Sequence, residues 1–160
     1  MRTWPDRAGW VRLALEAAWL APVLLALGFA GGLMSWAPRV DAGMSRLAGV
    51  ALIAPALGEE LLFRAALLPK SQPGPLPWPP ILVSTGLFVL WHPPQAWLFG
   101  PHWARTVLDP WFLACVAALG IASARLYLRT GSIWPSVVLH WFVVVAWKAL
   151  LGGPSPWVAA

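Results

Sequence analysis

The sequence predicts an all-α protein, a polytopic helical bundle that crosses a membrane with about five transmembrane helices. Apolar residues make up 59% of the chain and charged residues only 11%, well below the roughly one quarter that is usual for soluble proteins. The apolar residues fall into about five runs, each near the ~20 residues that a helix needs to cross a bilayer. Most of the 13 tryptophans lie near the ends of these runs, as in the aromatic belts of membrane interfaces.

The chain of 160 residues is long enough for one domain, which we expect to span residues 1–160. The formal charge of +5 comes without a Lys/Arg cluster interleaved with aromatics, so we expect a lipid bilayer and no nucleic acid as partner. Cys115 is the only cysteine and lies within a span, which excludes an intramolecular disulfide. Trp19, Trp91 and Trp141 lie within spans, and we expect them to pack inside.

The five expected spans cover residues 10–34, 44–68, 80–99, 110–128 and 133–151. The linker over residues 73–80 is rich in proline, and it cannot be helical before its end because proline lacks a backbone donor. Residues 129–132 predict a tight turn, with Ser132 as the N-cap of the fifth helix.

The first span is preceded by arginines, as a secretory signal is, but it is longer than the apolar region of such a signal. We therefore expect a retained anchor. Glu16, its one acidic residue, is four residues after Arg12, which predicts an ion pair near the membrane surface.

Loop charges predict a cytoplasmic N-terminus and an outer C-terminus, because Lys and Arg concentrate in cytoplasmic loops. The segments that would then be cytoplasmic carry six basic residues, which are Arg2, Arg7, Arg12, Lys70, Arg125 and Arg129. The outer loops carry Arg39, Arg46 and Arg105, and Lys148 lies near the outer end of the fifth span.

Three ionisable residues, Glu59, Glu60 and Arg64, lie inside the second span. Each would cost roughly 2.5–3.5 kcal/mol at the bilayer centre if it faced lipid, so we expect them to face protein or trapped water. On a helix Glu60 and Arg64 share a face, while Glu59 points about 100° away. Arg64 would then neutralise Glu60 and leave Glu59 without a charge partner on its helix, free to act as a general base.

Of the three histidines, His102 lies in a loop, and His92 and His140 lie within spans. At ~1.5 Å per residue, Glu59, His92 and His140 each fall within about 5 Å of the middle of their spans, so they can converge. Two mechanisms of hydrolysis fit them. In one, Glu59 removes a proton from water, and His92 and His140 orient that water or stabilise the oxyanion. In the other, His92, His140 and Glu59 bind zinc, which lowers the pKa of its water.

These residues resemble the three motifs of the CAAX-processing and bacteriocin-processing (CPBP, or Abi) intramembrane proteases, relatives of the Ras-converting CAAX endopeptidase. The motifs are Glu59-Glu60-x-x-x-Arg64, Phe88-x-x-x-His92 and the stretch from Arg129 to His140. The resemblance covers residues 44–151, which would form the catalytic core. It implies Glu59 as the base that activates water, with His92 and His140 beside it. Glu60, Arg64 and Phe88 would be supporting residues.

The resemblance further implies an endopeptidase of a bacterial inner membrane that cuts a membrane-associated protein or a C-terminal signal. Two other classes fit the same residues. One is a non-catalytic scaffold or immunity protein on the same fold. The other is a proton-coupled transporter, since buried Glu, Arg and His also form proton relays; the absence of an internal repeat argues against it.

One position departs from the family pattern. The third motif usually ends in Asn or Asp four residues after its histidine, where this chain has Val144. Either His140 acts alone at the oxyanion, or another donor replaces the missing one. The candidates are Trp141, Trp147, Lys148, Ser84 and Thr85.

The pair Pro93-Pro94 directly follows His92. We expect it to kink or end the third helix there, and such backbone within a membrane is tolerated where it lines a polar cavity.

Overall fold

The computed structural model describes residues 4–39, 41, 43–69, 74–99 and 102–154. These residues form α1 (Arg7–Ala30), α2 (Gly43–Ala51), α3 (Trp78–Phe99), α4 (Pro110–Thr130) and α5 (Trp134–Leu150). Two π-helical segments, η1 (Leu52–Glu59) and η2 (Leu61–Ala65), follow α2, and the 3-10 helix η3 (His102–Leu108) precedes α4. Over the described ranges β-structure is limited to a bridge between Ala37 and Leu151. The all-α prediction is confirmed.

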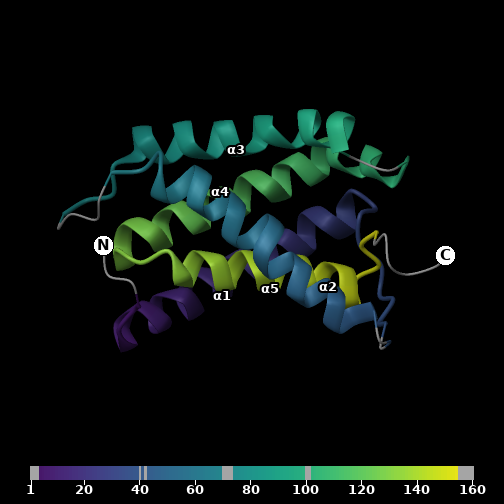
Figure 1. Ribbon diagram of the computed structural model, residues 1–160, viewed down its shortest axis with the longest axis horizontal. Helices are drawn as coiled ribbons and strands as arrows, with labels where there is room; N and C mark the ends of the chain where they lie inside the picture. The colour runs from purple at the N-terminus through teal and green to yellow at the C-terminus, as the bar shows by residue number, and fades with distance from the viewer. Residues whose placement is uncertain (1–3, 40, 42, 70–73, 100–101, 155–160) are drawn as a thin grey trace.

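The long elements run back and forth along one direction, so that α1 begins at one end of the bundle and α5 ends at the other (Figure 1). Helix α4 contacts α1, α3, α5 and η2, and α5 packs against α2 and η1. The largest buried apolar cluster includes Leu20 and Leu24 of α1, Leu119 and Leu126 of α4, and Leu139 of α5. Because α4 touches three other helices, its packing fixes the spacing between the helices that carry the expected site.

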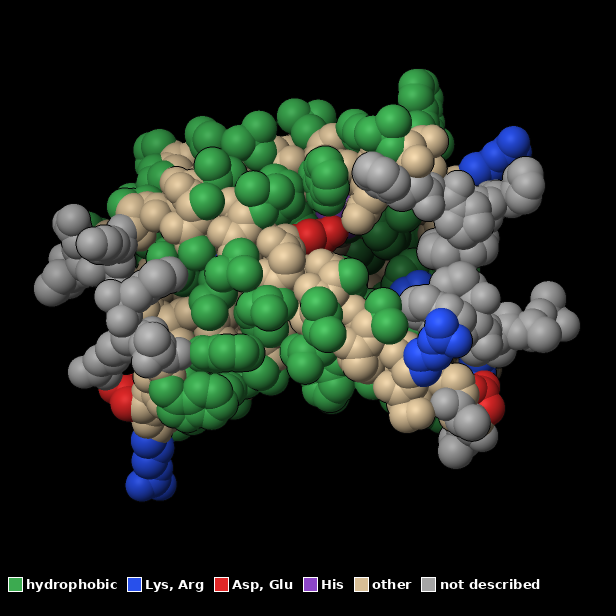
Figure 2. Space-filling view, in the orientation of Figure 1, with side chains coloured by type: hydrophobic (Ala, Val, Ile, Leu, Met, Phe, Trp, Pro, Cys, Tyr) green, Lys and Arg blue, Asp and Glu red, His purple; other side chains and the backbone are tan. Residues whose placement is uncertain are grey.

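Two helices among the described residues, α1 and α4, are long and apolar enough to cross a membrane, and α5 is a shorter apolar helix. Hydrophobic side chains cover most of the face in Figure 2. Exposed large side chains such as Leu82, Leu90 and Phe142 lie on α3 and α5. A surface of this kind is unfavourable in water and suits contact with lipid.

The second predicted span is one helical stretch, but it is not a single α-helix as expected. It begins as α2 and continues as the π-helices η1 and η2. Pro55 lies inside η1 and has no N–H to donate to the preceding turn, which interrupts the α-helical hydrogen-bond ladder. π-Helical turns occur frequently at functional sites, and here they carry Glu59 and Arg64.

The tight turn predicted before α5 is present. Gly131 adopts φ 66° and its N–H donates to the Tyr127 carbonyl at 2.9 Å, which is the left-handed C-terminal geometry that glycine favours. The predicted N-cap is wrong by one residue, since Ile133 is the N-cap of α5 and has no side-chain cap. Ser132 is buried, and its Oγ accepts from the Trp134 N–H at 3.4 Å, at the start of α5. This turn sets the position of His140 along the bundle.

The sequence spacing predicted an ion pair between Glu16 and Arg12, and this prediction is wrong. The Glu16 carboxylate lies across the α1–α4 interface from Arg125, whose Nε is 3.0 Å from Oε1, and it accepts from the Trp19 indole at 2.5 Å. Arg12 instead donates to the carbonyl of Arg129. The i,i+4 spacing considers only residues of one helix, whereas the packing of α1 on α4 brings Arg125 closer to Glu16 than Arg12.

We predict that Arg125→Ala weakens the attachment of α1 to α4. The variant removes the cation beside the largely buried Glu16 carboxylate and leaves the Trp19 N–H as the hydrogen-bond donor described for it. The expected loss is about 1–3 kcal/mol of unfolding free energy, measured by thermal unfolding of the purified protein in detergent. Arg129→Ala, at an exposed position one turn along the same helix, is the matched control. Equal stability of the two variants would contradict the assignment.

Candidate active site

The centre of the site is a fully buried ion pair between Glu60 and Arg64. Arg64 Nε lies 3.2 Å from Glu60 Oε2, and both side chains have 0% exposure. Arg64 Nη1 also donates to Ser84 Oγ at 3.1 Å, and Ser84 Oγ donates to the Phe63 carbonyl at 2.6 Å. The guanidinium lies over the Phe88 ring, 4.7 Å from its centroid. Contacts on several sides therefore hold Arg64 in place beside Glu60.

Glu59 precedes this pair and faces a different set of groups. Its side chain is 8% exposed. Gln95 on α3 donates to its Oε1 at 3.4 Å, and His140 Nε2 lies 3.8 Å from its Oε2. The two neighbouring carboxylates therefore have different surroundings. Glu60 pairs with a cation, whereas Glu59 contacts an amide and an imidazole.

His140 of α5 lies between the two carboxylates. Its Nδ1 is 3.0 Å from Glu60 Oε1, and its Nε2 faces Glu59 across 3.8 Å. A carboxylate oxygen accepts, so Nδ1 carries a proton and donates a hydrogen bond to Glu60 Oε1. In the neutral form of the ring, the Nε2 atom that faces Glu59 is then a hydrogen-bond acceptor.

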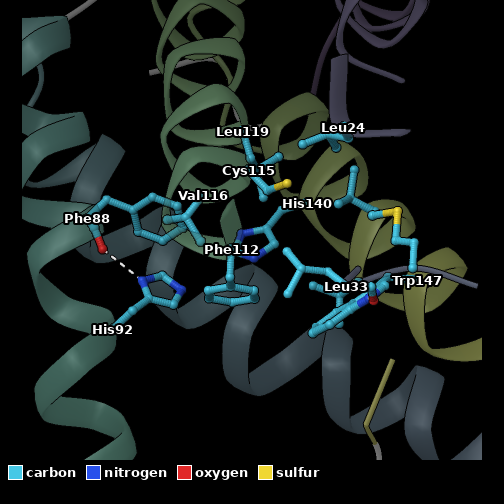
Figure 3. Close-up of a pocket in the computed structure, with 13 residues that line it drawn as sticks. Leu24, Leu33, Phe88, His92, Phe112, Cys115, Val116, Leu119, His140 and Trp147 are labelled. Carbon is cyan, nitrogen blue, oxygen red and sulfur yellow. Dashed lines mark hydrogen bonds between the residues drawn. The ribbon is translucent and has the colours of Figure 1, made fainter. Parts of the chain in front are cut away.

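His92 of α3 is fixed in the same way by a backbone acceptor. Its Nδ1 is 2.8 Å from the Phe88 carbonyl (Figure 3). A carbonyl oxygen only accepts, so Nδ1 donates and Nε2 of the neutral ring keeps its lone pair. The Phe88 ring packs edge-on against both imidazoles, with centroids 4.9 Å from His92 and 5.8 Å from His140. The Phe88 ring therefore contacts both imidazole rings and helps to set the distance between them.

A cavity of about 90 Å³ adjoins both imidazoles. Figure 3 shows its lining, which is apolar apart from the two histidines and Cys115, and which draws on α1, α3, α4 and α5. Val144 is among the lining residues. In Figure 2 acidic side-chain atoms come to the surface beside a hollow in the hydrophobic face. The site can thus receive an apolar group next to ionisable side chains.

Four of the five donors offered as replacements at Val144 are already engaged. The Trp141 indole donates to the Ala48 carbonyl at 2.8 Å, the Trp147 indole donates to the Leu33 carbonyl at 3.2 Å, and Lys148 donates to the Pro154 carbonyl. Ser84 donates to Phe63, as described above. Thr85 Oγ1 is buried without a hydrogen-bond partner, but it lies seven residues before His92, about 10 Å away along a helix.

Of the two outcomes expected at Pro93 and Pro94, a kink or an end of the third helix, the structure excludes the end. Helix α3 does not end near His92 but continues through both prolines to Phe99. The continued helix places Gln95 three residues after His92, on the same side, where it reaches Glu59. The spacing of Gln95 from His92 is the signal in the sequence that points to this contact.

Metal ligation was the second mechanism that the sequence left open. Across the ranges that the structure describes, no group of three or more His, Cys, Asp or Glu side chains is placed to hold a metal ion.

Comparison with known families gives one match. A family model described as Rce1-like, type II CAAX prenyl endopeptidase Rce1-like, matches residues 41–146. This range includes Glu59, Glu60, Arg64, Phe88, His92 and His140. Comparisons with curated proteins and with solved structures give no match.

We predict that Arg64→Ala lowers the stability of the protein as well as any activity, because it leaves the Glu60 carboxylate buried without a cation. Breaking a buried pair in this way costs about 3–5 kcal/mol. The measurements are abundance in the membrane and thermal unfolding in detergent, with Arg105→Ala at an exposed position as the control.

A double variant, Glu60→Gln with Arg64→Met, removes both charges and should recover part of the lost stability. A purely catalytic defect in Arg64→Ala, with normal abundance and unfolding temperature, would refute the structural role of the pair.

Proposed function

Because the chain belongs to the Rce1-like family of type II CAAX prenyl endopeptidases, we propose that it is an intramembrane endopeptidase that uses water activated by Glu59. Membership confirms the resemblance seen in the three motifs and makes the chain a CAAX-type membrane protease. The observation that carries the proposed mechanism is the 3.8 Å approach of His140 Nε2 to Glu59 Oε2. Of this pair, His140 lines the apolar cavity.

The first step is activation of water. A water oxygen ~2.8 Å from each atom, the usual hydrogen-bond length, can donate one proton to Glu59 Oε2 and the other to His140 Nε2. Glu59 takes its proton as general base, and the water oxygen forms a bond to the substrate carbonyl carbon. The π electrons of the carbonyl move to its oxygen, which becomes the oxyanion.

The second step is collapse of the tetrahedral intermediate. The oxyanion re-forms the carbonyl, the bond from carbon to nitrogen breaks, and the proton held by Glu59 passes to the leaving nitrogen. The products are a carboxylic acid and an amine, so the atoms of water are accounted for. Glu60 and Arg64 take no part in bond making. They keep the His140 ring in the tautomer whose Nε2 accepts from water.

The substrate that we propose is a membrane-associated protein or its C-terminal signal. The exposed hydrophobic side chains around the bundle suit a substrate that arrives through the lipid. We further propose that the protein lies in a bacterial inner membrane with its N-terminus in the cytoplasm, as the loop charges suggest.

Zinc-dependent hydrolysis remains the alternative for the same site, and it is tested on the purified protein. Metal analysis after detergent purification and cleavage assays with and without a chelator distinguish the two mechanisms. Stoichiometric zinc together with chelator-sensitive cleavage would replace the proposed mechanism with the metal one.

We predict that Glu59→Gln abolishes cleavage while the protein still accumulates in the membrane, because glutamine keeps the shape and loses the base. The measurement compares the terminal peptides of membrane proteins from cells that carry the wild-type chain or Glu59→Gln. A defined set of proteins should stay uncut in the variant.

The matched control is Glu16→Gln, which removes a carboxylate remote from the cavity. Identical terminal peptides in wild type and Glu59→Gln at equal abundance would favour the non-catalytic scaffold instead. Near wild-type cleavage by Glu59→Gln would refute Glu59 as the base.

A further inference from the structure

The cavity beside the histidines has walls from different parts of the chain. His92 comes from α3 and His140 from α5, whereas Leu24, Leu33 and Met34 come from α1 and the segment that follows it. We call these last three residues the α1 wall. In Figure 3, Leu24 and Leu33 lie on the side of the cavity opposite His92. The α1 wall therefore bounds the cavity on the side away from α3.

The α1 wall lies outside residues 41–146, the range that the family model matches. Its backbone is nevertheless fixed to two helices. The N–H groups of Leu33 and Met34 donate to the Gly28 carbonyl of α1, at 2.8 and 3.1 Å. The Trp147 indole of α5 donates to the Leu33 carbonyl at 3.2 Å. A part of the chain that the family match does not cover thus completes the cavity.

The Met34 side chain is backed by α1. A Cβ atom at Gly28 would come within 2.7 Å of Met34 Cγ and 2.8 Å of Met34 Cε, so methionine occupies the space that glycine leaves open on the helix. The same side chain lines the cavity. Because α1 lies directly behind it, Met34 cannot withdraw in that direction, and its bulk limits how far the cavity extends.

Size and polarity restrict what the cavity can hold. Its volume is about 90 Å³, and its lining is apolar apart from His92, His140 and Cys115. An engineered apolar cavity of ~150 Å³ is large enough to bind a benzene ring, and this cavity is smaller. An aliphatic side chain fits these limits. An aromatic ring does not, and neither does a farnesyl chain, the smaller of the two common prenyl groups of proteins.

The cavity also adjoins the proposed chemistry. His140 lines it, and the Nε2 atom of this residue lies 3.8 Å from Glu59 Oε2. A side chain held in the cavity would therefore belong to a residue beside the bond that is cut.

We propose that the cavity is the subsite for one aliphatic side chain of the substrate, next to the scissile bond, and that Met34 sets the largest side chain that it admits. This inference rests on the proposed protease function. It assigns substrate selection to the α1 wall, whereas the catalytic residues lie within the range that the family model matches.

The test measures kcat/KM of the detergent-purified full chain on peptides that cover a cut site found in the comparison of terminal peptides. The residue on each side of the scissile bond is changed in turn to alanine, valine, leucine or phenylalanine. At one of the two positions, we expect wild type to favour leucine over phenylalanine by at least about tenfold, the discrimination typical of an apolar pocket.

Met34→Ala enlarges the cavity and should lower this ratio of leucine to phenylalanine at least about tenfold. Met34→Val removes less of the side chain and should lower the ratio by a smaller factor. The ratio compares two peptides on one preparation, so a loss of folded protein does not change it. Leu25→Ala, at a 41% exposed position of α1, is the matched control and should leave the ratio unchanged.

The possible failures differ in what they refute. If wild type cuts the phenylalanine and leucine peptides equally well at both positions, the cavity is not the subsite. An unchanged ratio in both Met34 variants would show that Met34 does not set the limit. Either result overturns this inference while cleavage itself still supports the protease function. If the wild-type chain cuts no peptide, the protease function is wrong, and the subsite with it.

Discussion

The arrangement of the site depends on one buried ion pair, Glu60 with Arg64. A carboxylate with no exposure in an apolar bundle is tolerable only beside a compensating cation and with its remaining acceptor positions used. Arg64 supplies the cation, and His140 donates to the other oxygen of Glu60. Ser84 and the Phe88 ring hold Arg64 from the side of α3. The pair thereby joins η2, α3 and α5, the elements that bring the rest of the site together.

The π-helical turns explain how two adjacent carboxylates take different roles. Glu59 closes η1, and Glu60 separates η1 from η2. Glu60 turns inward to the cation, whereas Glu59 turns to α3 and α5, where it meets Gln95 and the Nε2 side of His140. The same imidazole contacts both carboxylates. Glu60, which Arg64 neutralises, therefore fixes the ring, and Glu59 can act together with the ring on a water molecule. Structural and chemical functions are divided between neighbours in the chain.

Local patterns predicted the parts of this molecule that depend on short-range spacing. Apolar runs gave the helices to within a few residues, and the i,i+4 rule gave the Glu60–Arg64 pair, because both properties belong to a single helix. The partner predicted for Glu16 was wrong, because Arg125 is 109 residues away in the sequence and only the packing of α1 on α4 brings it close. The π-helical turns were also not foreseen, and of the two outcomes expected at Pro93 and Pro94, a kink or an end of the helix, the end does not occur. The rotation of each helix decides which donors are free, and that rotation is set by its neighbours.

Val144 is best understood through the tautomers of the two histidines. An asparagine at that position would add a donor to a site in which both imidazoles, held through Nδ1, present acceptors to the cavity when their rings are neutral. With valine there, the lining that α5 gives to the cavity is apolar around His140, and the amide that approaches Glu59 comes from Gln95 of α3. Gln95 follows His92 by three residues, so the two groups share one side of α3. The apolar residue on α5 therefore leaves these groups of α3 in place.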